Sequence, residues 1–212
     1  MATITDITPQ KKRSGYYNIF VDDKYAFSVS DLQLSNFDLS IGKEYSETEL
    51  VTLVENATIS KAYTRCLEYI IRRRRSEQEI RDYLKRKEFV EGAIDEVVKR
   101  LIRENYINDR EFASAWIADR NLIKPRSKRV LQLELIKKGI DREIIQAAIE
   151  QQSVEDELDN LRKIAEKKLP RMRDKNKLMS YLVGLGFGYG QVREVVDELM
   201  AKDYELSGDT DN

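Results

Sequence analysis

Basic side chains gather at two places in this sequence, 51 residues apart. Four consecutive arginines, Arg72 to Arg75, form the denser group, and Lys124, Arg126, Lys128 and Arg129 form the other. Guanidinium and ammonium groups bind phosphate oxygens and carboxylates through charge-assisted hydrogen bonds. Because the basic group recurs in register, the pattern favours binding of a polyanion or an acidic protein surface. The alternative is a pair of solvated helix ends whose cations interact with the helix dipole.

The candidate contact residues extend from these groups onto the helix that follows the arginines. They are Arg72, Arg73, Arg74, Arg81, Lys85, Lys87, Lys124, Arg126, Lys128 and Arg129. Consecutive residues point around the whole circumference of a helix, so the four arginines cannot all meet one partner. Arg75 and Arg126 are alternatively structural residues at helix junctions.

Several classes of catalytic site are excluded or unsupported. The chain has no histidine, which removes Ser-His and Cys-His nucleophiles, histidine-ligated zinc and the usual general base at neutral pH. The single cysteine, Cys66, cannot form an internal disulfide, and it aligns with Ile117 as a small buried residue. We therefore expect no enzyme, no metal site and no cofactor.

Two other motifs have a structural interpretation. The glycine-rich stretch from Gly184 to Gly190 lacks the Lys-Ser/Thr pair of a phosphate-binding loop, so it is expected to be a turn between helices. Phe112 and Trp116 are four residues apart on one predicted helix, which favours a core position. Stacking of these aromatic rings on nucleic-acid bases is the alternative.

The elements that carry the basic residues repeat with a period near 50. Apolar positions stay in register across three copies. The matching sets are Ile80, Leu131 and Leu178; Leu84, Leu135 and Leu182; Ile94, Ile145 and Val192; and Val98, Ile149 and Val196. Such self-similarity is typical of tandem helical arrays. We predict a mainly α protein with three tandem three-helix repeats, each resembling a helix-turn-helix module, in a curved and elongated array.

Helix signals give the expected limits of each element. The predicted helices are 60–73, 76–87 and 90–104; 109–122, 126–138 and 141–151; and 154–168, 173–184 and 188–201. The predicted domains are an N-terminal domain at 1–58, repeats at 59–106, 107–152 and 153–204, and a disordered tail at 205–212.

The N-terminal domain is expected to contain strands, and these are confined to about the first 30 residues. Aromatic and β-branched runs at 17–21 and 24–29 flank Asp22-Asp23 and predict a hairpin. A short helix is expected at 32–37. Ser46 with Glu49 forms a capping box that opens a further helix, ending near Glu55.

Charge is unevenly distributed along the chain. The formal net charge is −1, but residues 60–139 carry 21 basic and 13 acidic side chains, whereas both flanking segments are acidic. A basic middle fits contact with a polyanion or an acidic partner. We expect no membrane span and no secretory signal, and the single cysteine fits a cytoplasmic protein.

These residues resemble the RecX family, the regulatory proteins of RecA recombinase. The similar segments are Ala62-(x)4-Leu67, Arg75-Ser76-Glu77-(x)-Glu79-Ile80-(x)3-Leu84, Asn105-Tyr106-Ile107-Asn108-Asp109-(x)2-Phe112-Ala113 and Arg120-(x)5-Arg126-(x)8-Leu135-(x)2-Lys138-Gly139-Ile140. The likeness covers about 60–200. It departs at Asn105 and Glu88, where the family usually has glycine.

The resemblance implies a protein that inserts into the groove of the RecA–DNA filament. It implies suppression of ATP hydrolysis, strand exchange and coprotease action, with the RecA filament and single-stranded or double-stranded DNA as partners of a monomer. Two alternatives remain open: a helix-turn-helix regulator that reads DNA, and a scaffold for another protein. The third helices of the first two repeats begin with acidic residues, which disfavours the DNA reader.

Overall fold

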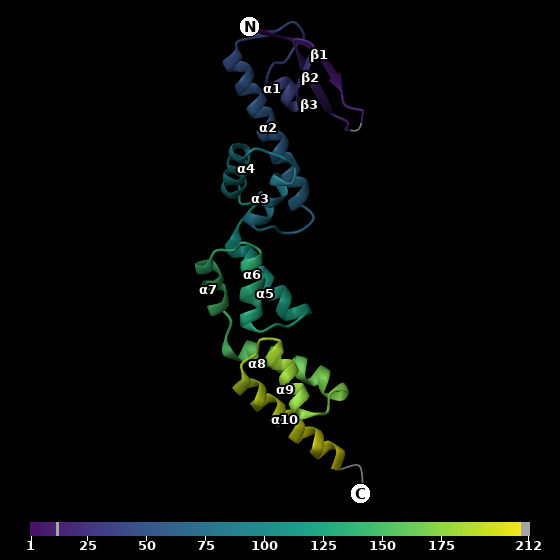
Figure 1. The fold of residues 1–212 in the computed structure, drawn as a ribbon, viewed down its shortest axis with the longest axis vertical. Helices are drawn as coiled ribbons and strands as arrows, with labels where there is room; N and C mark the ends of the chain where they lie inside the picture. The colour runs from purple at the N-terminus through teal and green to yellow at the C-terminus, as the bar shows by residue number, and fades with distance from the viewer. Residues whose placement is uncertain (12, 209–212) are drawn as a thin grey trace. The chain divides into compact units, whose positions relative to one another are not determined.

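The computed structural model describes residues 1–11 and 13–208, and it divides into two compact units (Figure 1). The first unit contains Met1–Arg75 and Glu79–Ile107, which cover the N-terminal domain and most of the first repeat. The second contains Ser76–Gln78 and Asn108–Asn212, which include the second and third repeats.

A four-stranded antiparallel sheet forms the N-terminal part of the first unit. Its strands are β1 (Ala2–Pro9), β2 (Tyr16–Val21), β3 (Lys24–Ser30) and β4 (Glu44–Tyr45), in the order β3-β2-β1-β4. Asp22 and Asp23 both have left-handed φ values, 47° and 61°, as a two-residue hairpin turn requires. The predicted hairpin is therefore confirmed.

Strand β4 corrects the expectation that strands end near residue 30. Ala2 pairs with Tyr45 and Thr3 with Glu44, so two residues close the far edge of the sheet. Tyr45 is buried in the core of the sheet. A strand of two residues has no periodicity of its own, so only its partner strand reveals it.

Helix α2 (Glu47–Ile70) is one continuous helix where two were predicted, and it runs through the predicted domain boundary at 58/59 (Figure 1). It begins at the predicted Ser46 capping box, in which Ser46 Oγ accepts from Glu49 N at 3.2 Å. It then continues without a break. No glycine or proline interrupts the helix, and the Thr58 hydroxyl donates to Val54 O at 2.7 Å within it.

Two hydrophobic cores share this one helix. Its first half packs Leu53, Val54 and Ala57 against the sheet, beside the short helix α1 (Asp31–Asn36). Its second half places Ala62 and Cys66 in the core of the first repeat. The N-terminal domain and the first repeat are thus joined by a rigid element.

The first repeat continues with α3 (Glu77–Lys85) and α4 (Glu91–Arg103). Its core is aliphatic and follows the predicted register, with Ile80, Leu84, Ile94 and Val98 fully or almost fully buried. Residues three and four apart on each helix supply this apolar face.

The second repeat contains α5 (Asp109–Ile123), α6 (Lys128–Lys137) and α7 (Arg142–Glu150). Phe112 and Ile117 are buried in its core, and Trp116 is partly buried against it. The phenyl and indole rings stack with centroids 5.8 Å apart. The core position predicted for both aromatic residues is confirmed.

The third repeat contains α8 (Val154–Lys168), the 3₁₀ turn η1 (Leu169–Arg171), α9 (Lys175–Gly184) and α10 (Tyr189–Gly208). The glycine-rich stretch is the turn between α9 and α10, as predicted. The expected tail at 205–212 is wrong for 205–208, because α10 meets no helix breaker before Gly208. Residues 209–212 lie outside the described part of the chain.

One backbone position is left-handed in all three repeats. It follows the second helix of each repeat and holds Glu88, Gly139 and Gly186, with φ values of 62°, 74° and 90°. Glycine adopts this conformation without steric cost, whereas a residue with a Cβ atom is strained. Asn105, after α4, is left-handed as well, at 59°. Glu88 and Asn105 stand where the family usually has glycine, and both keep the left-handed backbone that glycine favours.

The second and third repeats meet through buried polar contacts inside the second unit. The buried Ser127 hydroxyl donates to Leu185 O at 3.0 Å, and Asn160 donates to Asn121 at 2.9 Å. Gly186 fits against this junction so closely that an added Cβ atom would lie 2.6 Å from Ser127 Oγ. A glycine is required here by both φ and space.

Candidate binding surface

The four consecutive arginines follow the end of α2, and two of them make internal contacts. Arg73 binds both carboxylate oxygens of Glu79, at 2.7 and 3.1 Å. The Arg75 guanidinium lies 3.6 Å from the centre of the Tyr69 ring, which in turn stacks on Tyr83 at 4.2 Å. Arg75 therefore has the structural role at a helix junction that the sequence left open.

Arg72 and Arg74 are exposed to solvent, as is Arg73, which is paired with Glu79. Arg75, by contrast, is half-buried. Arg72 and Arg74 therefore remain candidate contact residues.

The cations of α3 face acidic residues of α4. Arg81 contacts Asp95 at 2.7 Å, and Lys85 contacts Glu91 at 3.2 Å. The hydrogen bond from Arg81 lowers the pKa of the Asp95 carboxyl below its ordinary value. Two cations of the predicted basic face, Arg81 and Lys85, are therefore paired with carboxylates of their own repeat. Lys87, in the turn after α3, is exposed.

In the second repeat, two cations surround one carboxylate. Arg120 Nε donates to Glu134 Oε2 at 2.7 Å, and Arg126 Nε lies 4.0 Å from Glu134 Oε1. Trp116 Nε1 also donates to Oε2, at 2.8 Å. Burial raises the pKa of Glu134, but the hydrogen bonds from Arg120 and Trp116 outweigh it, so the pKa lies below its ordinary value.

The remaining basic residues of the second repeat divide in the same way. Lys128 Nζ donates to Gln152 O at 2.8 Å, and Lys128 N donates to Glu157 at 3.0 Å, so this residue belongs to the junction with the third repeat. Lys124 and Arg129 are exposed. Of the predicted basic residues in this repeat, these two are exposed, whereas Arg126 and Lys128 are half-buried.

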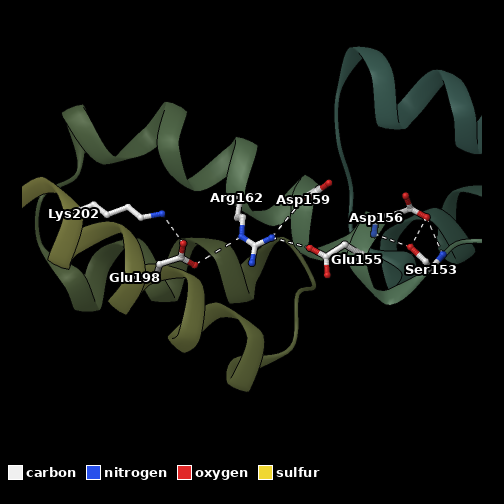
Figure 2. Close-up of polar contacts among 7 residues, drawn as sticks. All are labelled: Ser153, Glu155, Asp156, Asp159, Arg162, Glu198 and Lys202. Carbon is white, nitrogen blue, oxygen red and sulfur yellow. Dashed lines mark hydrogen bonds and ion pairs between the residues drawn. The ribbon is translucent and has the colours of Figure 1, made fainter.

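The third repeat neutralises its central arginine internally, as Figure 2 shows. Arg162 on α8 contacts Glu155 at 3.0 Å and Asp159 at 3.3 Å on its own helix. Its Nε lies 3.9 Å from Glu198 on α10, which is also bound by Lys202 at 2.7 Å. This network joins α8 to α10 and leaves an acidic balance around the arginine.

In each repeat, side chains of the first and second helical segments contact each other at an equivalent position, but the residue types differ. The residue before the buried leucine of the second helix is Tyr83, Glu134 or Tyr181. Its partners are an aromatic ring, a guanidinium and an ammonium group. Tyr69 and Tyr83 stack with ring centroids 4.2 Å apart, and Arg120 Nε lies 2.7 Å from Glu134 Oε2. Lys168 Nζ lies 5.0 Å from the centre of the Tyr181 ring. The fold therefore conserves the contact and not the residue type.

Large aliphatic side chains at two helix ends were missed by reasoning from the sequence. Ile71, directly after α2, is 87% exposed, and Leu122 and Ile123, at the end of α5, are 85% and 79% exposed. Each lies beside one of the basic groups. Their only sequence signal was that they fall outside the apolar register of their repeats.

Among residues 1–11 and 13–208, no group of three or more Cys, Asp or Glu side chains is placed to hold a metal ion. Within the same residues, no helix is both long and apolar enough to cross a bilayer.

Four family models match along the chain. They are the Regulatory protein RecX N-terminal domain at 2–46, and the first, second and third three-helix domains of RecX at 62–101, 108–149 and 155–196. Regulatory protein RecX of Bacillus subtilis is 35% identical over 217 residues, covering 100% of this chain and 81% of the relative. The chain belongs to the RecX family.

Other RecX proteins share the sequence or the fold. Regulatory protein RecX of Listeria welshimeri is 39% identical over 83% of this chain, and the match spans 65% of that relative's length. A crystal structure of regulatory protein RecX superposes with a TM-score of 0.71 at 28% identity, covering 93% of this chain and all of the other. The structure of RecX from Lactobacillus salivarius gives 0.62 at 28% identity, over 67% and 96%.

These comparisons confirm the predicted family and fold class. The RecX models for the three-helix domains fall on the three predicted repeats, and the model for the N-terminal domain falls on the sheet. The matching relatives are named as regulatory proteins.

Proposed function

We propose that this protein binds the RecA–DNA filament and lowers its ATPase, strand-exchange and coprotease activities. The observation that carries this proposal is membership in the RecX family across the N-terminal domain and all three repeats. We further propose that it acts in the cytoplasm as a monomer, with DNA as an additional contact.

The exposed cations support a contact with an acidic surface. Arg72, Arg74 and Lys87 in the first repeat and Lys124 and Arg129 in the second are exposed. Exposed cations of this kind steer association and raise its rate more than they add to final affinity. We therefore expect binding to weaken as salt concentration rises.

The test is the DNA-dependent ATPase activity of RecA on single-stranded DNA, with this protein titrated in. We expect inhibition below one molecule per RecA subunit, because a protein bound in a filament groove or at its end affects many subunits. An unchanged rate at several-fold excess over RecA would contradict the proposal.

A control separates filament binding from simple masking of DNA. The titration is repeated at two DNA concentrations, with the RecA concentration fixed and all RecA bound to DNA at both. If the protein only sequesters DNA, the inhibitory concentration rises in proportion to DNA. If it acts on the filament, the inhibitory concentration stays the same at both DNA concentrations.

A further inference from the structure

Two helix ends expose aliphatic side chains at matching positions of the first and second repeats. Ile71 and Leu122 are 51 residues apart, the same spacing that relates buried Leu84 to buried Leu135. Their exposed fractions are 87% and 85%, and Ile123 next to Leu122 is 79% exposed. Single exposed apolar residues are common on protein surfaces. Recurrence at the repeat period distinguishes these from scattered ones.

The fold does not need these side chains in either repeat. Among the described residues, the hydrophobic core of the first repeat includes Ile70 but not Ile71, and the core of the second includes neither Leu122 nor Ile123. A large aliphatic side chain left in water does not contribute the free energy that its burial would supply. A polar residue at these positions would serve the fold equally well.

The third repeat differs at the corresponding point. Its chain turns through η1 there, and Pro170 takes the matching position. The preceding Leu169 packs against the core of its own repeat. The exposed aliphatic feature therefore belongs to the first two repeats, which also carry the basic groups.

Exposed cations lie beside the aliphatic side chains in the sequence. Arg72 and Arg74 follow Ile71, and Lys124 follows Ile123. An apolar tip bordered by positive charge is complementary to an apolar pocket with a carboxylate rim. Such a combination resembles the core and rim of a protein–protein interface.

We propose that Ile71 and the Leu122–Ile123 pair are apolar anchors that enter pockets on an acidic protein surface, and that RecA subunits of the filament provide those pockets. This inference rests on the proposed function. A filament presents the same surface on each subunit, so it offers equivalent pockets to equivalent anchors. Branched aliphatic side chains have no aromatic face for stacking on bases, which favours protein over DNA as the occupant.

The test compares serine variants of the full chain for binding to RecA filaments on single-stranded DNA. One variant is Ile71→Ser, and the other combines Leu122→Ser with Ile123→Ser. The matched control is Leu32→Ser, at a position on α1 that is 71% exposed. We expect each anchor variant to bind filaments at least about tenfold more weakly, as central interface residues do, and the control to bind normally.

Thermal unfolding and naked-DNA binding complete the test. Exposed substitutions change stability little, so all variants should unfold at the wild-type temperature. Affinity for labelled oligo-dT without RecA should also be unchanged. A matching loss of oligo-dT affinity would overturn the inference, because the side chains would then contact DNA.

Two outcomes with filaments distinguish this inference from the proposed function. If both anchor variants bind filaments with wild-type affinity, or if Leu32→Ser loses as much affinity as they do, the anchoring role is refuted. The proposed binding to filaments would still stand. Failure of the wild-type protein to bind filaments would refute the proposed function itself.

Discussion

The indole nitrogen of Trp116 on α5 donates a 2.8 Å hydrogen bond to Glu134 on α6. The same carboxylate oxygen accepts from Arg120 at 2.7 Å. Trp116 is the only tryptophan in the chain, so its fluorescence reports directly on this contact. The second repeat therefore contains an intrinsic probe of its own integrity.

Replacing Glu134 with alanine should destabilise the second unit. The substitution leaves the Trp116 donor without its partner and two cations without their counter-ion. We expect the free energy of unfolding to fall by about 1–3 kcal/mol, as for loss of a hydrogen bond to a charged group. Urea unfolding followed by tryptophan fluorescence measures this. Glu134→Gln keeps an acceptor for the indole and should lose less; an equal loss would show that the indole bond contributes nothing.

Stability should also depend on the charge of Glu134 at acid pH. Its pKa in the folded protein lies below the ordinary value of 4.5, so the folded state favours the carboxylate. The resulting stabilisation is present above pH 4.5 and is lost as pH falls through the folded-state pKa. The difference in unfolding free energy between wild type and Glu134→Gln should therefore shrink on acidification. A constant difference across this range would contradict the role of the charge.

Alkaline pH should weaken the first repeat through the buried Cys66 and the half-buried Tyr63. Burial raises the pKa of the Cys66 thiol from 9.0 to about 12. Burial and the hydrogen bond to Glu104 raise the pKa of Tyr63 from 10.0 to about 12. Both groups favour their neutral forms in the folded state. Their stabilisation is complete below the unfolded-state pKa values and is lost as pH rises toward 12.

Denaturation as a function of pH in the variants Cys66→Ala and Tyr63→Phe tests this prediction. Each variant should show a smaller loss of stability between pH 8 and about 11 than the wild type. Alkylation of Cys66 by iodoacetamide at neutral pH should be slow in the native protein and fast in urea, because burial and a raised pKa suppress the thiolate. Rapid native labelling would contradict the buried position.

Glycine at position 88 should stabilise the protein. Glu88 has a φ of 62°, where the corresponding residues of the other repeats are Gly139 and Gly186. Relief of left-handed strain exceeds the extra entropy that glycine gives the unfolded chain, so we expect Glu88→Gly to gain up to about 1 kcal/mol. Thermal or urea unfolding checks the sign.

The reverse change, Gly186→Ala, should cost about 1–3 kcal/mol. Its φ of 90° disfavours a Cβ atom, and that atom would lie 2.6 Å from Ser127 Oγ. The control is Gly190→Ala on α10, where nothing lies within 4 Å of the added atom. The control should be neutral or slightly stabilising. Equal effects at both positions would refute the role of the close junction.

Charge reversal should separate contact residues from structural ones. Arg74→Glu and Arg129→Glu change exposed side chains, so we expect weaker filament binding, a smaller dependence of binding on salt concentration and an unchanged unfolding temperature. Arg81→Glu places a second carboxylate beside Asp95, 2.7 Å from the present guanidinium, and should lower the unfolding temperature. Normal binding by both exposed variants would move the interface elsewhere.

Much of the fold follows from local sequence signals. The apolar register predicted the core residues of all three repeats, including Leu84, Leu135 and Leu182, because a buried helix face needs one apolar residue every three or four positions. Strand β4 and the continuity of α2 were not predicted. The first depends on pairing with a distant strand, and the second lacks any local start or stop signal.

The candidate surface was less predictable than the fold. Charge density located the basic segments but could not show which of their cations make contacts inside the protein. Arg81 and Asp95 are 14 residues apart on different helices, and Lys128 Nζ donates to the carbonyl oxygen of Gln152, 24 residues further along the chain. Such pairs depend on tertiary packing, which the spacing of charges along one helix does not reveal.

Helix α2 limits how this architecture can be divided or shortened. A truncation at residue 58 would begin inside the helix and remove the capping serine, Ser46, that fixes its start. A cut at 45 would keep the helix but expose Leu53, Val54 and Ala57, which the sheet now covers. Loss of the sheet in a shorter descendant would therefore require new polar residues along half of a helix that the first repeat must retain. The sheet and the first repeat are consequently bound to evolve together, although each has a core of its own.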